Sequence, residues 1–402
     1  MPIRYMGTKR SVATHVQAQL AALAPAGPVL DLFSGIGCVA ERLATIAPVH
    51  TNDALSFTAV LARARFKGER RKSVQQLVSA FRPAYRESSE QESRKSRSSL
   101  RAEQRALDHG QAALASYMDQ AEHAGNSARI RRLAITAAAT TDISHYRMIR
   151  FYFAAGYFST RQAIQLDALR FAIDGANLTR ADRDWALSAW ISAAATLINA
   201  PGHTAQYLRP NSEAAYRRIR RVWVRPVWDT FYNELLSIKP VGNASWRKAN
   251  RVDVSDAIAL LKKQLRGLGA VYADPPYTKD QYSRYYHLYE SMYQYDYPES
   301  AGAGRVRSDR FVSPFCLKTQ VAESFASLFA AVAAHDVPLV LSYPSEGLLS
   351  TTGTTIEDIA VDHLSLKTAL SFGTQHSTMG ASKGATTKSA TENIYVYTPR
   401  GR

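Results

Sequence analysis

The sequence predicts an α/β fold built on a parallel sheet and interrupted by a mostly helical insertion. Short apolar runs near both ends of the chain finish in acidic or polar residues, and glycine or proline turns follow them. The middle of the chain is rich in charged, helix-forming residues. Ligands of open α/β folds bind at the carboxyl ends of the strands. We therefore expect residues 1–66 and 250–402 to form one ligand-binding domain that residues 67–249 interrupt.

The composition is that of a globular protein. The chain has 402 residues, of which 46% are hydrophobic, and this is enough for a sizeable core. No apolar stretch approaches the roughly 20 residues of a membrane helix, and "MPIRYMGTKR" lacks the apolar core of a signal peptide. We expect a cytoplasmic protein. Cys38 and Cys316 are too few for a thiolate zinc site, so we expect both to be reduced and structural, with no metal.

The net charge of +16 indicates a polyanionic partner. Residues 67–249 contain 29 Lys and Arg against 16 Asp and Glu, which is +13 of the total. The excess therefore lies in the insertion. The alternative is an ordinary solvated helical surface.

The first element is a strand, "PVLDLF" at 28–33, followed by a glycine turn and a helix. Gly35 and Gly37 allow backbone N–H groups to approach a ligand closely. Ala40 stands where an ordinary dinucleotide site has its third glycine, which argues against that class. A second strand, "VHTND", ends in Asp53, which is placed to accept hydrogen bonds from ribose hydroxyls. Alternatively, Asp31 and Asp53 only cap strand ends.

Helices dominate the middle of the chain. Residues 160–173 predict one helix, with Thr160 as its cap, and 180–200 predict another that "PG" ends. Strands return after residue 250, in "AVYADPPY", "VPLVLSYPS" and "NIYVYTP". The insertion therefore separates two parts of one sheet.

Four motifs together resemble a known family. "RYMGTK", "DLFSGIGCVA", "ND" at 52–53 and "DPPY" at 274–277 are similar, in this order, to the motifs of S-adenosylmethionine-dependent adenine-N6 DNA methyltransferases. The likeness is greatest to the Dam-like group and, within it, to restriction-modification methylases of the FokI type. It covers residues 1–66 and about 146–402, whereas 70–145 resemble nothing known to us.

The resemblance implies a Rossmann-like S-adenosylmethionine methyltransferase domain with an inserted, mostly helical target-recognition domain. It also implies site-specific transfer of a methyl group to N6 of a flipped-out adenine in duplex DNA. A restriction-modification or phage-defence setting follows from the likeness, with a cognate endonuclease in the same pathway and a nucleoid-associated place in a bacterial or archaeal cytoplasm.

The resemblance also implies a cofactor site. Asp53 would hold the ribose, Asp256 would accept from the adenine amino group, and Lys9 would meet the carboxylate of the cofactor. Lys9 could instead be a surface lysine. The implied cofactor residues are Tyr5, Lys9, Asp31, Phe33, Ser34, Gly35, Gly37, Asp53 and Asp256.

The implied catalytic residues are Asp274, Pro275, Pro276 and Tyr277. An exocyclic amine is a poor nucleophile because its lone pair is delocalised into the ring. Asp274 and the carbonyl of Pro275 can accept its two hydrogens and draw the nitrogen toward tetrahedral geometry, with the prolines fixing the direction of the carbonyl. Tyr277 offers a flat face to the flipped base. An ordinary proline-rich turn is the alternative.

DNA contacts are expected from four segments. The arginines of "YRRIRRVWVRPVW" suit phosphates and guanine, and its aromatic residues can stack on bases, unless the tryptophans belong to the core. "GHTAQYL" and "QYSRYYHLYE" offer polar and aromatic side chains, with Tyr285, Tyr286 and Tyr289 expected to pack. The loop at 376–393 suits phosphate contact. The candidates are His203, Gln206, Tyr207, Arg217, Arg221, Tyr282, Arg284, His287, Lys383 and Lys388.

Other functions stay open at this point. Methylation of cytosine N4 uses the same type of amine clamp, although that family usually has serine in place of Asp274. An RNA target is a further variant, and a nucleic-acid-binding subunit with a silent catalytic fold belongs to a different class. The intact motif at 274–277 argues against silence.

Overall fold

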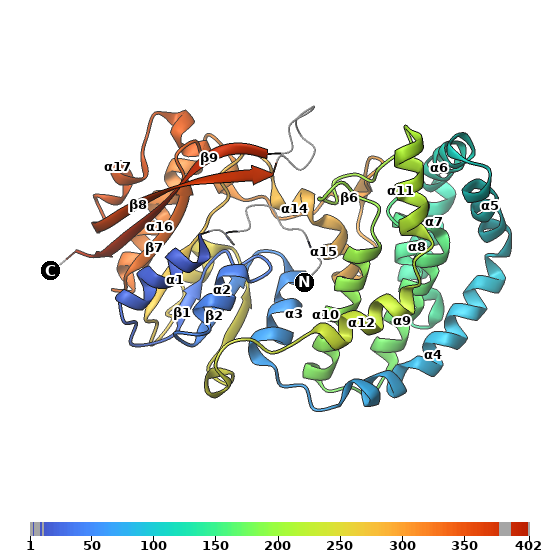
Figure 1. Cartoon of the computed structure of the whole chain (residues 1–402), viewed down its shortest axis with the longest axis horizontal. Helices are drawn as coiled ribbons and strands as arrows, with labels where there is room; N and C mark the ends of the chain where they lie inside the picture. Colours follow the sequence, from blue (N-terminus) through green and yellow to red (C-terminus); the bar gives the residue numbers. More distant parts are fainter. Residues whose placement is uncertain (1–2, 4–8, 10–11, 378–386, 401–402) are drawn as a thin grey trace. The chain divides into compact units, whose positions relative to one another are not determined.

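A computed structural model describes residues 3, 9, 12–377 and 387–400, with the backbone alone at 374–377 and 387–390 (Figure 1). The chain divides into two compact units. The helical unit contains Glu69–Ile238 and Tyr285–Arg310. The sheet unit contains the described residues from Lys9 to Gly68, then Lys239–Arg284 and the described residues from Phe311 onward. Residues 285–310, which the sequence placed with the catalytic part, therefore pack with the helical unit.

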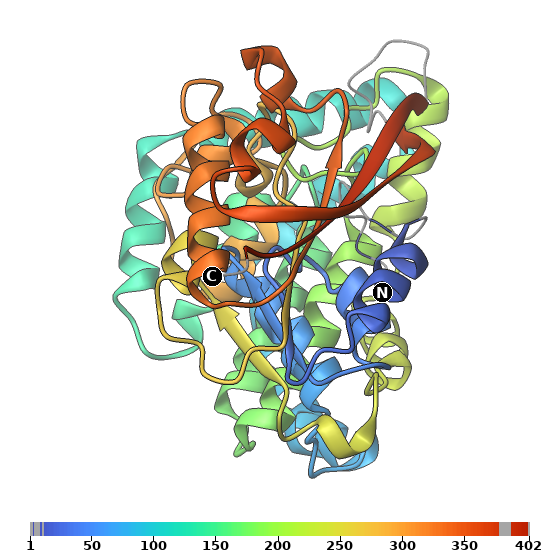
Figure 2. The same cartoon turned by 90° about the vertical axis from the view of Figure 1, so that its left-hand side faces the viewer.

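A seven-stranded sheet organises the described part of the sheet unit, in the order β3-β2-β1-β4-β7-β9-β8. Its first five strands are parallel, and β9 runs antiparallel to both of its neighbours. Figure 2 shows the paired β8 and β9 in red. The predicted α/β class with a mostly parallel sheet is confirmed. The strands are β1 (Val29–Asp31), β2 (Val49–Asp53), β3 (Arg251–Val254), β4 (Ala270–Ala273), β7 (Leu339–Pro344), β8 (Leu364–Ser377) and β9 (Thr387–Pro399).

Alternate strand residues face two different cores. Leu30 and Val271 pack with one buried cluster, to which the helix α16 (Val321–Ala334) contributes Phe325. Their neighbours Val29 and Tyr272 pack with a second cluster. Because successive side chains of a strand point to opposite faces, a strand that is apolar at every position is buried on both sides. The sheet is therefore the middle of three layers.

Helices cover the sheet on both faces. The first cluster includes residues of α13, α16 and α17, and the second includes residues of α1 and α2. The helices of this unit are α1 (Ala13–Ala22), α2 (Cys38–Leu43), α3 (Ser56–Ala62), α13 (Ala257–Leu261), α16 (Val321–Ala334) and α17 (Ile356–Ala360). Short helical turns are η1 (Arg63–Lys67), η3 (Ala244–Trp246), η4 (Pro314–Cys316) and η5 (Leu348–Thr352), and α14 (Tyr282–Tyr285) lies at the boundary between the units.

The helical unit consists almost entirely of helices, as the composition predicted. They are α4 (Val74–Lys95), α5 (Arg97–Asp108), α6 (Gln111–Gly125), α7 (Ala128–Ala138), η2 (Ile143–His145), α8 (Met148–Phe153), α9 (Thr160–Gly175), α10 (Arg180–Leu197), α11 (Glu213–Trp223), α12 (Val227–Ser237) and α15 (His287–Gln294). A small hairpin pairs β5 (Ser300–Ala301) with β6 (Val306–Arg307). Within the described ranges, no helix combines the length and the apolarity that crossing a bilayer requires.

The cap of α9 differs from the prediction. Ser159, not Thr160, is the N-cap, and it forms a capping box with Gln162. Ser159 has an extended backbone, so its hydroxyl can accept from the Gln162 amide at 3.1 Å, whereas Thr160 is already helical. The Thr160 amide instead donates to the buried carboxylate of Glu103 on α5.

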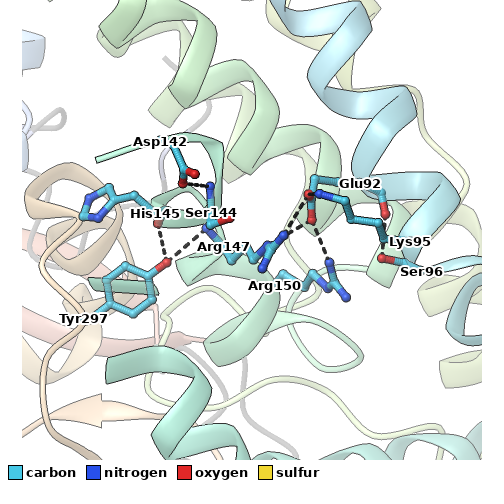
Figure 3. Close-up of polar contacts among 9 residues, drawn as sticks. All are labelled: Glu92, Lys95, Ser96, Asp142, Ser144, His145, Arg147, Arg150 and Tyr297. Carbon is cyan, nitrogen blue, oxygen red and sulfur yellow. Dashed lines mark hydrogen bonds and ion pairs between the residues drawn. The ribbon is translucent and has the colours of Figure 1, made fainter. Parts of the chain in front are cut away.

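The buried carboxylate of Glu92 ties α4 to the start of α8 (Figure 3). It accepts from Arg147 at 3.0 and 2.9 Å, from Arg150 at 3.2 Å and from Lys95 at 2.9 Å. Burial would raise the pKa of Glu92, but these cations hold its pKa below the usual value. Glu92 and Glu103 thus make the unfamiliar stretch 70–145 an integral part of the helical unit.

Candidate active site

A pocket lies at the carboxyl edge of the sheet, where the sequence placed the ligand. It encloses about 960 Å³ of space free of protein atoms, including space open to solvent. Ten residues predicted from the sequence line it. They are Lys9, Asp31, Phe33, Ser34, Gly35, Asp53, Asp256, Asp274, Pro276 and Tyr282.

The glycine turn after β1 has the backbone that its sequence requires. Gly35 and Gly37 have φ angles of 50° and 79°, in the left-handed region. A Cβ atom on Gly37 would also lie 2.9 Å from the ring of Phe66. Gly35 lines the pocket, whereas Gly37 shapes the turn from behind and is not among the lining residues.

Asp53 holds this turn in place. Its Oδ2 accepts from the Gly35 amide at 2.9 Å, and its Oδ1 accepts from the Leu55 amide at 2.9 Å. Each carboxylate oxygen has a second lone pair, so these bonds leave acceptor capacity toward the pocket. The predicted contact with a ribose stays a prediction.

Asp256 is a pocket residue, as expected, and it also caps a helix. It lines the pocket, and its Oδ1 accepts from the Ala259 amide at 2.9 Å as the N-cap of α13. The cap holds the carboxylate at the pocket wall. Its expected partner, an adenine amino group, is untested.

Asp31 is a buried acid at the end of β1. Its side chain is 1% exposed, and neither oxygen has a hydrogen bond of standard geometry to another described residue, with the Ala40 amide as a nearby donor. Burial, with help from the charges of Asp274 and Asp53, raises the pKa of Asp31 well above its usual value. A group in this state can donate a hydrogen bond as well as accept one.

Asp274 follows β4 and forms the centre of a buried ionic cluster. Nζ of Lys9 lies 3.0 Å from Oδ1 of Asp274 and 3.0 Å from Oε1 of Glu392 on β9. The side chains of Lys9, Asp274 and Glu392 are 5%, 16% and 1% exposed. Lys9 is therefore not a surface lysine. Its ammonium is paired with Asp274 and Glu392, and its side chain also lines the pocket. The predicted contact of Lys9 with the cofactor carboxylate stays a prediction.

Burial dominates the titration of Asp274 and raises its pKa to about 7. Lys9 opposes this shift, and Glu392 adds to it. The pKa of Lys9 is raised, because attraction to Asp274, Glu392 and Tyr277 outweighs the effect of burial. Lys9 is thus a permanent cation beside an acid that titrates near neutral pH.

The rest of the "DPPY" segment is packed tightly. Pro275 is buried, Pro276 faces the pocket, and Tyr277 packs partly against the sheet core. The ammonium of Lys9 lies 5.0 Å from the centroid of the Tyr277 ring. The Tyr277 carbonyl accepts from the Leu348 amide at 2.8 Å, which anchors the segment. The predicted stacking of a base on Tyr277 is untested.

Several predicted DNA-contacting residues have other partners. His287 is fully buried and bonds the Thr204 carbonyl at 2.7 Å, so its expected contact with DNA does not fit the fold. Tyr207 donates to Glu122 at 2.5 Å, and His203 lies against the Tyr285 ring at 4.8 Å between centroids. Trp223 is buried in the core of the helical unit and is not available for stacking on a base.

Other candidates remain accessible. Gln206, Arg221 and Arg284 are exposed, and Arg217 is exposed while paired with Glu213 at 2.9 Å. Tyr286 and Tyr289 are buried, as predicted for packing residues. Tyr5 and Lys383 lie outside the described residues, as does the side chain of Lys388.

The site also contains residues that the sequence did not indicate. Glu392 is the main one, and Tyr272 and Phe315 contribute to the pocket wall. Glu392 opens the apolar stretch "ENIYVY" of the last strand. A glutamate in that position is rarely buried without a partner, but the partner, Lys9, is 383 positions away.

Comparison with known proteins supports the resemblance. Residues 230–344 match the family described as D12 class N6 adenine-specific DNA methyltransferase. The chain is 27% identical over 198 residues to the type II methyltransferase M.FokI of Planomicrobium okeanokoites, covering 48% of this chain and 27% of that protein.

Two further relatives are modification methylases. The match to StsI of Streptococcus sanguinis is 21% identical over 369 residues, covering 90% of this chain and 47% of StsI. The match to LlaI of Lactococcus lactis subsp. lactis is 22% identical over 197 residues, covering 48% of this chain and 29% of LlaI. The chain thus spans less than half the length of each of these three relatives.

The family predicted from the ordered motifs is confirmed by these matches. The segment 230–344 includes β3, β4 and Asp274, which are the parts of the sheet that build the pocket. The segment 230–344 accordingly matches the D12 class of N6 adenine-specific DNA methyltransferases, and type II methyltransferases are distant homologues of the chain.

Proposed function

We propose that the protein transfers a methyl group from S-adenosylmethionine to N6 of an adenine that is flipped out of duplex DNA at a specific site. The observation that carries this proposal is the placement of Asp274 and the rigid Pro275–Pro276 backbone beside the pocket at the carboxyl edge of the sheet. A carboxylate and a fixed carbonyl are the two acceptors that an exocyclic amine requires.

The pocket residues fit S-adenosylmethionine. Asp53 and Asp256 supply acceptors for hydroxyl and amino groups, and the buried oxygens of Asp31 lack standard hydrogen bonds to other described residues. Phe33, Ile36 and Phe315 form apolar walls for an adenine ring. When bound, S-adenosylmethionine supplies an electrophilic methyl group on a sulfonium.

The protein's own contribution is to activate and orient the amine. Asp274 accepts one hydrogen of the amine, and the Pro275 carbonyl accepts the other, so the nitrogen lone pair turns out of the ring plane. This lone pair forms the new N–C bond, and the nitrogen then loses one proton. Asp274, with a pKa of about 7, can take that proton. Because the acceptor must be ionised, the transfer rate should rise with pH through the neutral range.

We propose the helical unit as the target-recognition domain. Two acids of its stretch 70–145 are buried, while several arginines of the unit are exposed. Glu92 (Figure 3) and Glu103 are buried on internal partners. Arg97, Arg101 and Arg161 are exposed along one groove. No acidic side chain of the described residues lines this groove, which consists of Ser93, Arg94, Arg97, Leu100, Arg101, Gln104 and Arg161. Such a surface suits the phosphates of duplex DNA.

The names of the relatives favour a restriction-modification setting. A modification methylase protects DNA from a cognate endonuclease, so we propose such an endonuclease as a partner in the same pathway. A protein that acts on the chromosome in this way would work at the nucleoid.

Removing the groove arginines should flatten the salt dependence of DNA binding. For Arg97→Ala/Arg101→Ala, the slope of log K against log salt should become less steep by about 2, because two phosphate contacts are lost. Fluorescence anisotropy with a DNA duplex measures this slope. Lys262→Ala/Arg266→Ala removes two exposed charges from the sheet unit and is the matched control. Equal slopes for both variants would contradict the assignment of the groove.

The reaction itself is tested with labelled S-adenosylmethionine and duplex DNA, followed by analysis of the nucleosides. Labelled N6-methyladenine is expected. Labelled N4-methylcytosine would move the assignment to the cytosine class. DNA binding without any label would identify a silent subunit.

A further inference from the structure

The buried glutamate of β9 has no part in the reaction derived so far. Glu392 pairs in the sheet register with Pro344 of β7 and Phe372 of β8, and its side chain is 1% exposed. A buried carboxylate costs several kcal/mol unless a cation compensates it. Lys9 is that cation, with its Nζ at 3.0 Å from Oε1 of Glu392. The same Nζ lies 3.0 Å from Oδ1 of Asp274, so Glu392 reaches the catalytic acid through one shared cation.

The shared cation leaves the cluster with one uncompensated negative charge. Two carboxylates face one ammonium, and each has an oxygen 3.0 Å from Nζ of Lys9. If Lys9 faced Asp274 alone, the pair would be neutral and the carboxylate would be a poor proton acceptor. Glu392 attracts the same ammonium, and its negative charge raises the pKa of Asp274. The Asp274 carboxylate therefore remains a good proton acceptor. Glu392 also fixes the position of the ammonium, and therefore of the carboxylate that the ammonium holds.

We propose that Glu392 is a positioning residue of the methyl transfer, which acts through Lys9 to orient the Asp274 carboxylate and to keep it a good hydrogen-bond and proton acceptor. The inference rests on the proposed function. The proton step balances: methylation leaves the nitrogen positively charged, one N–H bond breaks with its electron pair staying on nitrogen, and Asp274 changes from carboxylate to carboxylic acid. The cluster of Lys9, Asp274 and Glu392 thereby goes from a charge of −1 to zero, and the proton then passes to solvent.

The surroundings of Asp274 agree with this role. Burial raises its pKa to about 7, Lys9 lowers it, and Glu392 raises it. The pKa of Asp31 is raised well above its usual value, chiefly by burial, which favours its neutral form. Both tyrosines nearby have raised pKa values, since burial disfavours their phenolates. Among the residues that the structure describes, the titratable and charged groups that face Asp274 are Lys9, Glu392, Asp31, Tyr272 and Tyr277.

The test compares Glu392→Gln with the unaltered full-length protein. Glutamine keeps the size and loses the charge, so the pKa of Asp274 should fall. The pH of half-maximal single-turnover rate should move down by about one unit or more, and the plateau rate should fall roughly ten-fold. Affinity for S-adenosylmethionine should be unchanged.

Glu392→Asp, which restores the charge, should return the midpoint of the pH–rate profile to that of the unaltered protein. Glu323→Gln, an exposed glutamate of the same unit, should change neither quantity.

A second measurement does not depend on turnover. Infrared difference spectra taken against pH follow carboxyl titration, and subtraction of Asp274→Asn identifies Asp274. A midpoint near pH 7 is expected in the unaltered protein, and a lower midpoint in Glu392→Gln. An Asp274 that titrates at its ordinary pH in the unaltered protein would overturn the inference, whether or not the variant folds. Folded Glu392→Gln with an unshifted midpoint in both experiments would overturn it too. Absence of methylation by the unaltered protein would instead defeat the proposed function.

Discussion

Asp274→Ala should lower the rate of methyl transfer by roughly 10²–10³-fold or more, the usual cost of removing one preorganised electrostatic contact in an active site. The variant retains the Pro275 carbonyl but loses the acceptor that draws the second hydrogen out of the ring plane. It also loses the group that takes the proton. Single-turnover transfer of labelled methyl groups to duplex DNA measures the effect.

Binding of S-adenosylmethionine should survive this substitution, because the glycine turn, Asp53 and Asp256 are untouched. Calorimetric titration checks this point. The matched control is Asp280→Ala, which removes an exposed carboxylate six positions later in the chain and should retain full activity. Retained turnover in Asp274→Ala would refute the amine clamp. Loss of cofactor binding together with activity would mean that Asp274 supports the pocket and not the chemistry.

Lys9→Met should lower the free energy of unfolding by about 3–5 kcal/mol, the range found when one partner of a buried ion pair is removed. The substitution leaves the carboxylates of Asp274 and Glu392 buried beside each other without a cation. Urea denaturation followed by circular dichroism measures the change. Lys262→Met, at an exposed position of the same unit, should shift stability by less than about 0.5 kcal/mol.

The destabilisation by Lys9→Met should depend on pH in a defined direction. Without Lys9 the pKa of Asp274 in the folded state rises further above its unfolded value, so the folded state binds more protons than the unfolded state. Stability then falls as pH rises above about 4, the unfolded pKa of aspartate. The loss should therefore be larger at pH 8 than at pH 5. A loss that is equal at both pH values would contradict the pairing of Lys9 with buried carboxylates.

The motifs of the catalytic half follow local rules, which is why they were readable in the sequence. Gly35 and Gly37 mark a turn with left-handed backbone, and Asp53 ends the strand "VHTND", which the structure reproduces as β2. Asp256 and Asp274 stand at the ends of β3 and β4 or just beyond them, and parallel strands bring such residues to one edge. The place of the pocket at that edge followed from these patterns, whereas the resemblance to the family was needed to name residues such as Lys9 and Asp256 among those that line it.

Two strands of the seven-stranded sheet were not expected. β3 is short, and the burial of its residues does not alternate in the manner of a core strand, because it lies at the edge of the sheet. β8 is long but mostly exposed where its side chains are described, so its apolar residues do not form a buried run. Edge strands carry weak hydrophobic patterns, since they bury little of their surface.

The sequence by itself determined the α/β class, the order of the sheet and helical parts, the glycine turn and the acids at the strand ends, since each depends on neighbouring residues. The order of its motifs carried the resemblance to the family and to its cofactor residues. Only the tertiary structure decided which charges meet. It turned Glu92 and Glu103 inward, buried His287 and Trp223, assigned residues 285–310 to the helical unit, and joined Lys9 to both Asp274 and Glu392. Charged side chains that pair across hundreds of residues leave no local pattern in the sequence. They attract each other strongly only in the low-dielectric interior, which forms when the chain folds.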